Sequence, residues 1–480
     1  INFQYLGEKR MQLGKTLRQN SAFLYLIFLI ILTAPSFADE LSTWAQHSRP
    51  LFLENLLKNI SPEGTVRGTV IASPSRENPN YYFHWVRDSS LVMQTILNEY
   101  QKASNPTLKN KYLQKIEDFI RLSKANQAAA SQVTAYAVAR FNVDGTIPSD
   151  KWPSPQDDGP ALRAVFFIRL AQIWIAEGHS DWVKEKLYNS QTQSLIKSDL
   201  EFTSHSWQRT SYDLWEELHG HHFFTRIAQR RALIEGGKLA LVLHDYDAGG
   251  WYLKQADLLQ NQMLNYWNEN KGYLLGSLNV DGGIQYKTSQ LDTSVLLGVL
   301  YNSLQDGFYS LTDSKVLSTV SKLGQTFRQL YGINQKNLRG IAIGRYPEDR
   351  YDGISGDTQG SPWFLTTVAF AEYYYKVAKI FRAEGRISVN SRNLDFFQSL
   401  NVGRFTQGDV FPKSDKTFQL ILAKIRETGD DYLWRVMHHG LSNGSLSEQF
   451  NRNSGYMQGA NDLSWSYSAV VDALDARNKP

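Results

Sequence analysis

Three carboxylates stand among aromatic and apolar side chains in residues 211–218, which read SYDLWEEL. Acids packed against apolar rings cost free energy unless their charge or their proton is used. Glu216 follows Trp215 directly and has Asp213 and Glu217 nearby, so it is well placed to hold a proton and donate it. If this segment is helical, Asp213 shares a face with Glu216 and Glu217 points elsewhere. The alternative is a solvated acidic helix start that favours the helix dipole.

A second acid, Glu448, lies in the polar segment 446–450, LSEQF, far along the chain. A general base must be ionised and one water away from the carbon that reacts. Two carboxyl groups on opposite sides of one bond are the arrangement that glycoside hydrolysis requires. Asp213 is the competing base, but it would share a helical turn with Glu216 and would not face it.

Other unusual residues collect in segments that precede predicted helices. In residues 81–88, YYFHWVRD, Trp85 offers an apolar platform, while Arg87 and Asp88 offer a donor fork and an acceptor for hydroxyl groups. The alternative for that pair is a helix cap. In residues 152–163 the prolines hold the loop stiff and would keep Trp152 in one place.

The sequence offers few signals of a metal or cofactor site. His219, His221 and His222 lack the helical pairing of a zinc site, and the chain has no cysteine. We find no phosphate loop, dinucleotide-binding glycine pattern or nucleophile elbow. We therefore expect neither a metal nor a cofactor.

These residues must be positioned by helices, because apolar side chains recur at three- and four-residue spacing along most of the chain. Short strands are expected near 66–72 and 273–287. Twelve helices are predicted, near residues 42–59, 85–103, 108–128, 160–178, 180–200, 220–246, 250–268, 290–304, 313–331, 362–382, 415–435 and 461–476.

The phase of these helices indicates an architecture. The unusual residues lie in loops that lead into the second, fourth, sixth, tenth and twelfth helices, and more weakly the eighth. If alternate helices form an inner ring, all of these loops open at one end. We therefore predict an all-α fold, an (α/α)6 toroid of six helical hairpins with a site at the inner N-termini. Residues 39–480 would be one catalytic domain without a starch-binding module.

The composition and charge of the chain limit the kinds of molecule that it is expected to bind. The chain has 480 residues, with 42% hydrophobic and 20% charged residues and 12 Trp, 25 Tyr and 24 Phe, whose faces suit sugar rings. Residues 1–38 hold four basic side chains against Glu8, a net +3 of the total +4. The remainder is nearly neutral, which disfavours nucleic acid and suits a neutral glucan.

The N-terminus has the pattern of an export signal. A basic region at 11–18 precedes the apolar run 22–32, and Ser36, Phe37 and Ala38 allow cleavage before Asp39. The apolar run is short for a bilayer, so no stable membrane span is expected after cleavage, although an uncleaved anchor is the alternative. Residues before Met11 can be translated upstream sequence. We expect a secreted or periplasmic protein.

Six motifs in order give the chain its resemblance to glucoamylases of glycoside hydrolase family 15. They lie at 84–88, 158–163, 212–217, 344–349, 362–365 and 447–449, and the resemblance runs from about Trp44 to Ala476. It implies an (α/α)6 barrel that releases glucose, with inversion, from nonreducing ends of α-1,4 glucans such as starch, maltooligosaccharides and dextrins. The enzyme is expected to be a monomer.

The resemblance also implies roles for individual residues. Glu216 would be the general acid, Glu448 the general base, and Asp213 a supporting residue or alternative base. The implied substrate-binding residues are Tyr81, Trp85, Arg87, Asp88, Trp152, Trp215, Glu217, Arg345, Tyr351 and Trp363.

Some positions depart from the family pattern. Phe450 stands where fungal members often have Tyr, and Pro153 and Asp157 differ in the loop after Trp152. These differences leave open another linkage, such as α-1,6 dextran or trehalose. A sugar-binding protein without catalysis is a further alternative, although both acids are present.

Overall fold

The computed structural model describes residues 37–133, 136–190 and 194–478 of the chain. It divides into two compact units, Ile1–His47 and Ser48–Pro480. The described part of the first unit is the beginning of helix α2 (Phe37–Lys58), with Asp39 and Glu40 in its first turn. Almost all of the predicted export signal lies outside the described residues, so it stays a prediction.

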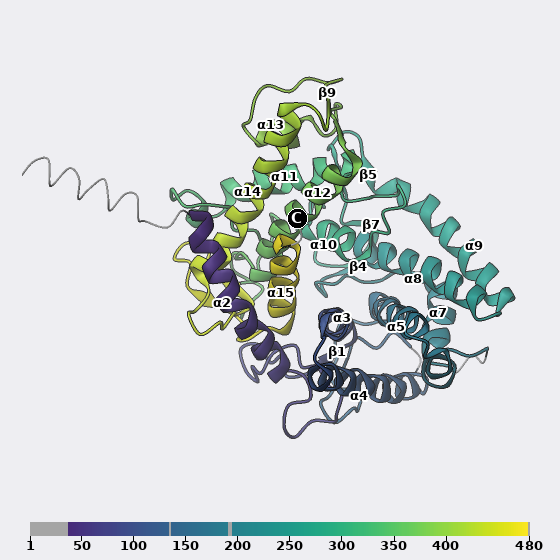
Figure 1. Cartoon of the computed structure of the whole chain (residues 1–480). Coiled ribbons are helices and arrows are strands. Elements are labelled where there is room, and N and C mark those ends of the chain that lie inside the picture. The colour runs from purple at the N-terminus through teal and green to yellow at the C-terminus, as the bar shows by residue number, and fades with distance from the viewer. Residues whose placement is uncertain (1–36, 134–135, 191–193, 479–480) are drawn as a thin grey trace, which may run out of the picture. The chain divides into compact units, whose positions relative to one another are not determined.

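Alternate helices of the second unit form a closed inner ring. Each contacts the next around the ring, and the last, α15, contacts the first, α3 (Figure 1). The ring confirms the predicted (α/α)6 barrel and the predicted phase of its helices. Its members are α3 (Val86–Lys102), α5 (Asp158–Ala176), α8 (Phe223–Val242), α10 (Thr293–Asn302), α12 (Phe364–Glu384) and α15 (Ser464–Asn478).

A second set of helices packs outside this ring, each against an inner neighbour in the chain. On α2, Arg49 Nε donates to Asp475 of α15 at 2.8 Å. The outer helices are α4 (Pro106–Ala130), α7 (Leu195–Ser206), α9 (Tyr246–Met263), α11 (Ser314–Leu330) and α14 (Lys416–His439). Shorter helices are α6 (Ser180–Trp182), η1 (Val183–Leu187), η2 (Leu264–Tyr266), η3 (Gly332–Asn334) and α13 (Leu394–Ser399).

Inner helices are apolar on nearly every side because both their faces are covered. In α5 most residues are buried, and it is long and apolar enough to resemble a membrane span. Its buried charge is paired, since Arg163 donates two hydrogen bonds to Asp199 of α7 at 2.8 and 2.7 Å. Its apolarity therefore serves the core of the barrel.

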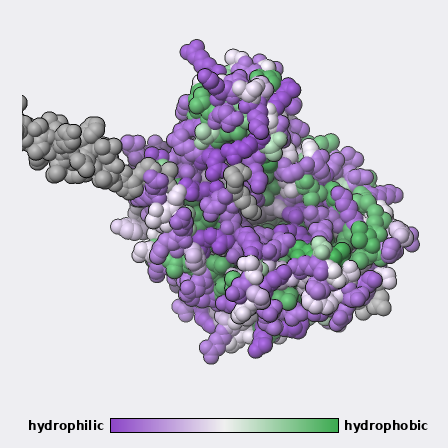
Figure 2. Space-filling model, in the orientation of Figure 1, coloured by the Kyte–Doolittle hydropathy of each residue, from purple (hydrophilic) through white to green (hydrophobic). Residues whose placement is uncertain are grey.

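The outer surface in view is mostly hydrophilic (Figure 2). Exposed apolar side chains gather at the end of α8 and along α9, at the right of that view. These residues are Val242, Tyr246, Trp251, Leu258 and Leu264.

One predicted helix is wrong. Residues 180–200 were expected to form a single helix, but the chain leaves the π-helix η1 after Leu187 and enters α7 only at Leu195. The stretch between them is polar, with Asn189, Ser190 and Ser194, and it supplies no apolar face for a helix to bury.

Only one strand was predicted of the three-stranded sheet that contains residues 211–222. It has three antiparallel strands, ordered β3 (Ser211–Tyr212), β4 (Leu218–His222) and β7 (Ser277–Gly283). The expected strand near 273–287 corresponds to β7 and to β6 (Tyr273–Leu274), whereas residues 66–72 contain only a bridge between Ile60 and Val70.

The remaining short strands form two-stranded antiparallel pairs. They are β1 (His84–Trp85) with β2 (Arg140–Phe141), β5 (Trp267–Asn268) with β6, β8 (Arg386–Ser388) with β9 (Val410–Pro412), and β10 (Gln449–Phe450) with β11 (Met457–Gln458).

Candidate active site

The predicted residues meet at one cavity of about 400 Å³, beside the beginnings of the inner helices. Arg87 and Asp88 lie in the first turn of α3, Trp363 immediately precedes α12, and Trp465 lies at the start of α15. Every predicted site residue lines this cavity except Asp213. The residues that helix count and loop phase assigned to one end of the ring are thus brought together around one cavity.

Glu216 stands on a tight turn between β3 and β4, in the loop that precedes α8, and not on a helical segment. Its backbone N–H donates to the Asp213 carbonyl at 2.9 Å, and its φ is +65°. A non-glycine residue in this left-handed region costs free energy, and such strain often occurs at functional positions. The turn projects the side chain away from the hairpin, so Glu216 and Asp213 share no helical face.

Asp213 holds that turn together. Its Oδ1 accepts hydrogen bonds from the backbone N–H groups of Glu217 at 2.8 Å and Leu218 at 3.0 Å. Its Oδ2 lies 3.5 Å from Lys287 Nζ, which also lies 2.5 Å from Asp292 Oδ2. Burial acts to raise the pKa of Asp213, but Lys287, His222 and the two N–H groups outweigh it and lower that pKa. Asp213 is thus an ionised, buried anchor behind the cavity wall.

The Glu216 carboxyl group is oriented by two neutral donors. Trp85 Nε1 donates to Glu216 Oε1 at 2.7 Å, and Gln156 Nε2 donates to the same oxygen at 2.8 Å. Arg87 Nη2 lies 3.5 Å from that oxygen. Because Oε1 is used as an acceptor, a proton on Glu216 belongs on Oε2, from which it can be donated into the cavity.

Glu448 is fully buried at the cavity wall, immediately before β10. The Tyr351 hydroxyl donates to Glu448 Oε2 at 3.3 Å and lies 3.1 Å from the Tyr81 hydroxyl. Within the described part of the chain, Glu448 Oε1 has no hydrogen-bond partner, which leaves it available to a water. Burial raises the pKa of Glu448 to about 8, against the lowering influence of Tyr81, Arg345 and Tyr351.

Arg87 and Asp88 form a charged pair on the cavity wall, with Nε and Oδ2 3.2 Å apart. Arg87 Nη1 also donates to Gln156 at 2.8 Å and to Asp158 at 3.3 Å. The helix-cap alternative is wrong, since Trp85 occupies the N-cap of α3 and no side chain caps it. A fixed guanidinium beside a carboxylate presents both donors and acceptors to sugar hydroxyls.

A second charged group lies farther along the wall, around Arg345. Arg345 Nη2 donates to Glu217 Oε1 at 2.7 Å and to Asp349 Oδ1 at 2.6 Å. The Tyr346 hydroxyl donates to the other Glu217 oxygen at 2.6 Å. Burial raises the pKa of Glu217 and Arg345 opposes this shift. Both groups are therefore held rigidly at the cavity.

Aromatic rings enclose the space between these polar groups. The Trp152 ring meets the Trp85 ring edge to face at 5.9 Å, and the Arg140 guanidinium lies 3.8 Å from the Trp152 centroid. The rings of Trp215 and Trp363 lie 5.7 Å apart. Flat apolar walls with a few fixed polar groups suit a sugar ring.

A family model for glycosyl hydrolases of family 15 matches residues 48–475 of this chain. The chain belongs to glycosyl hydrolase family 15. The glucoamylase of Blastobotrys adeninivorans is 33% identical to it over 459 residues, covering 92% of this chain and 73% of that protein. Glucoamylase 1 of Rhizopus oryzae is 33% identical over 451 residues, covering 93% and 72%. The solved family 15 glucoamylase from Hypocrea jecorina superimposes with a TM-score of 0.82 at 29% identity, covering 91% and 72%.

Several residues at the candidate site carry no signal in the sequence. Gln156 orients both Glu216 and Arg87, and Asp349 holds Arg345 by two hydrogen bonds. Gln156 lies in the loop 152–163 and Asp349 in the motif 344–349, but neither residue type indicates a role by itself. Trp465 lines the cavity from α15 and Lys287 anchors Asp213 from a distant loop, and no local pattern marks either of them.

The histidines of β4 have structural contacts. His222 Nδ1 lies 2.8 Å from the Ser277 hydroxyl and its Nε2 lies 2.8 Å from the Ser211 carbonyl oxygen. His219 Nδ1 lies 2.5 Å from Asp281 Oδ1. These bonds join the three strands that carry the Glu216 turn.

Proposed function

We propose that this family 15 chain is an inverting, exo-acting glucan 1,4-α-glucosidase that releases β-D-glucose from nonreducing ends of starch, maltooligosaccharides and dextrins. The observation that carries the proposal is the position of Glu216 and Glu448 on the wall of one cavity with the Arg87–Asp88 pair. The glucoamylase names of relatives over nine-tenths of the chain support the substrate class.

In the proposed reaction, Arg87 and Asp88 bind the hydroxyls of the terminal glucose, with Tyr81 and Trp85 beside it. Glu216 donates its Oε2 proton to the glycosidic oxygen as that bond breaks. Glu448 accepts a proton from water, and the water oxygen bonds to the anomeric carbon from the opposite side. The two carboxyl groups of an inverting enzyme should lie roughly 6.5–9.5 Å apart.

The remaining lining residues have positions suited to the rest of the substrate. Trp152 would pack near the acid, and Glu217 with Arg345 would bind the next sugar. Trp215, Tyr351 and Trp363 line the wall around Arg345 and would supply ring contacts to the glucan. Asp213 would act through the turn that it stabilises.

The roles of the two acids need a test that separates them, because burial and its raised pKa also favour Glu448 as a proton holder. α-D-Glucosyl fluoride provides that test, since fluoride leaves without protonation. Glu216→Gln should slow maltotriose hydrolysis by about 10²–10⁴-fold, the usual contribution of a general acid, and should spare glucosyl fluoride. Glu448→Gln should slow both substrates.

Exposed Glu384 on α12 offers a control, as Glu384→Gln removes a carboxylate away from the cavity and should leave both rates unchanged. If Glu448→Gln spared the fluoride and Glu216→Gln did not, the roles would be reversed. If Asp213→Asn slowed the hydrolysis of both substrates and Glu448→Gln retained full activity, Asp213 would be the general base.

The linkage is tested by the same purified protein. We expect rapid release of β-D-glucose from maltooligosaccharides. NMR that resolves the two anomers would monitor this release. Fast cleavage of trehalose or α-1,6 dextran with none of maltotriose would replace the proposed activity with one of those linkages.

We further propose that the protein is exported and acts as a monomer. The basic and apolar pattern of residues 11–38 supports export. N-terminal sequencing of the protein from the culture medium or periplasm should give Asp39 as the first residue. Sedimentation at the mass of one cleaved chain would support the proposed monomer.

A further inference from the structure

A second, larger pocket lies inside the barrel beyond the active site. Its volume is about 560 Å³, against about 400 Å³ for the active-site cavity, and all six inner helices contribute to its wall. On α3 and α15 it is lined by residues late in the helix, such as Asn98 and Asp472. The active-site residues of these helices lie in their first turns, so the inner pocket extends farther toward the opposite end of the ring.

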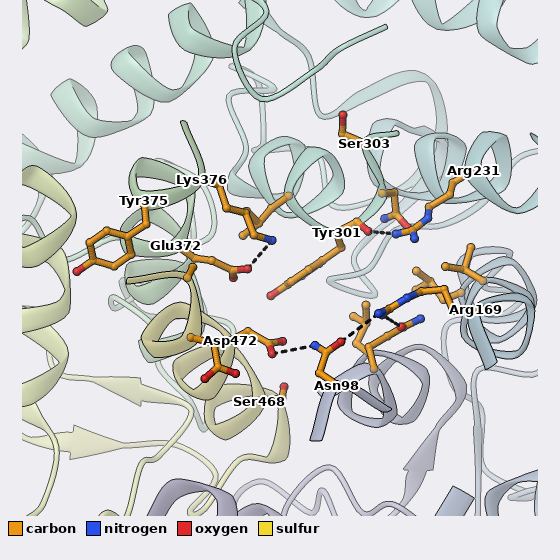
Figure 3. Close-up of a pocket in the computed structure, with 18 of the residues that line it drawn as sticks. Asn98, Arg169, Arg231, Tyr301, Ser303, Glu372, Tyr375, Lys376, Ser468 and Asp472 are labelled. Atoms are coloured by element: carbon orange, nitrogen blue, oxygen red, sulfur yellow. Dashed lines mark hydrogen bonds and ion pairs between the residues drawn. The ribbon is translucent and has the colours of Figure 1, made fainter. Parts of the chain in front are cut away.

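Charged side chains surround this pocket, and among the described residues the buried ones are compensated, whereas Lys379 is exposed. Figure 3 shows Glu372, Lys376 and Asp472 on one side, Arg169 and Arg231 on the other, and Tyr301 between them. Glu372 Oε1 lies 2.7 Å from Lys376 Nζ, and Arg231 Nε lies 3.1 Å from Glu235 on its own helix.

The remaining opposite charges are joined through Asn98. Arg169 Nη2 donates to Asn98 Oδ1 at 3.0 Å, and Asn98 Nδ2 donates to Asp472 Oδ1 at 3.4 Å (Figure 3). Thr95 donates to the other Asp472 oxygen at 3.0 Å. A ligand with a net charge would meet buried charges that are already paired or bridged, so the interior of the pocket favours a neutral occupant.

Unsatisfied hydrogen-bonding groups identify the kind of neutral ligand. Glu372 is 3% exposed and Asn302 is 1% exposed, and both line the pocket. Among the described residues, Glu372 Oε2 and both polar side-chain atoms of Asn302 have no hydrogen-bond partner. Such groups are costly when buried and are normally satisfied. A carboxylate oxygen accepts, and a carboxamide donates and accepts, which matches the two capacities of a hydroxyl group.

We propose that this pocket is a binding site for a neutral polyhydroxylated ligand of monosaccharide or disaccharide size, held by Glu372 and Asn302. The indole of Trp465 and the ring of Tyr301 also line it and offer aromatic contacts to such a ligand. The site is separate from the proposed reaction and stands whether or not that reaction is assigned correctly.

The two sites share one side chain. Trp465 lines both cavities, and its Nε1 donates to the Tyr301 hydroxyl at 3.3 Å. A ligand in the inner pocket would therefore contact a ring that also forms part of the active-site wall.

The test is hydrogen–deuterium exchange of the full chain with D-glucose or maltose, because peptides resolve where each ligand protects the backbone. A ligand that binds only the closed state slows opening by the factor 1 + [L]/Kd, about tenfold at ten times Kd. We expect that slowing in residues 298–306 and 466–478, in addition to any protection at 81–88 and 213–217.

Two variants locate the groups responsible. Glu372→Gln and Asn302→Leu should each lose protection of 298–306 and 466–478 and keep protection of the active-site segments. Glu384→Gln, on the same helix as Glu372, is the matched control and should behave as wild type. Retained maltotriose turnover and an unchanged melting temperature identify correctly folded variants.

Two outcomes would overturn the proposal. One is protection confined to the active-site segments at saturating glucose and maltose in the wild-type protein. The other is equal protection of the inner pocket by glycine or inorganic phosphate at the same concentration, which would identify a zwitterion or anion site.

Discussion

Tyr351→Phe should move the acidic limb of the pH profile of kcat/KM to higher pH. The Tyr351 hydroxyl donates to Glu448 Oε2 at 3.3 Å, and this bond favours the ionised carboxylate. Removing the hydroxyl leaves the ring in place and raises the pKa of Glu448 further. A base works only when ionised, so activity at a given pH on that limb must fall.

The structure gives the size of the shift. Hydrogen bonds to charged groups contribute about 1.5–3 kcal/mol. The 3.3 Å separation is long for a hydroxyl–carboxylate bond, so we take the lower end, about 1.5 kcal/mol. Since about 1.36 kcal/mol corresponds to one pKa unit, the limb should move by about one unit.

The assay is kcat/KM for maltotriose across the pH range, which reports ionisations of the free enzyme. Tyr346→Phe is the matched control, because Tyr346 donates to Glu217 at 2.6 Å and not to Glu448. It should lower kcat/KM at every pH without moving the limb. A folded Tyr351→Phe variant whose limb coincides with that of the wild type, or lies at lower pH, would refute our assignment of that limb to Glu448.

Two further predictions concern the hairpin that carries Glu216. Asp213→Asn should destabilise the protein by about 3–5 kcal/mol in urea unfolding, because it leaves buried Lys287 without one of its two carboxylates. Since the pKa of Asp213 is lowered on folding, its contribution exists above about pH 4 and is lost at lower pH. The variant's deficit should therefore shrink on acidification, and a deficit that grew instead would contradict the ion pair. Gly283→Ala should disrupt the same hairpin, because the residue has φ +94° and a Cβ would lie 2.0 Å from the Glu217 carbonyl oxygen. Gly272→Ala, at φ +71° with nothing within 4 Å, should cost only about 1–2 kcal/mol of backbone strain and keep full activity; equal activity of both variants would count against the turn as the support of Glu216.

Much of the barrel, and most of the residues that line the candidate site, were predictable because the relevant signals are local. Helices with continuous apolar faces, such as α12, appear in any short window of sequence. Motifs of rare residue types, such as Trp85 beside Arg87 and Asp88, stood out against the composition. The phase of these motifs along the helices then placed them at one end of the ring.

What escaped prediction depends on distant partners. Strand β3 has only two residues, and Leu218–His222 alternates in burial but not in residue type, so no strand was predicted on either side of the acidic turn. Its register depends on β7, and its anchor is Lys287, which pairs with Asp213 only in the folded chain. The burial of Glu448 also depends on residues distant in the sequence, because Tyr81 and Tyr351 enclose it from two other loops.

The side chain of Trp465 has a consequence for how the two cavities respond to a single substitution. It lines both the active-site cavity and the inner pocket, and its Nε1 donates to the Tyr301 hydroxyl at 3.3 Å. Truncating the Trp465 ring would therefore enlarge both cavities at once, so a change in activity in such a variant would not belong to either cavity alone.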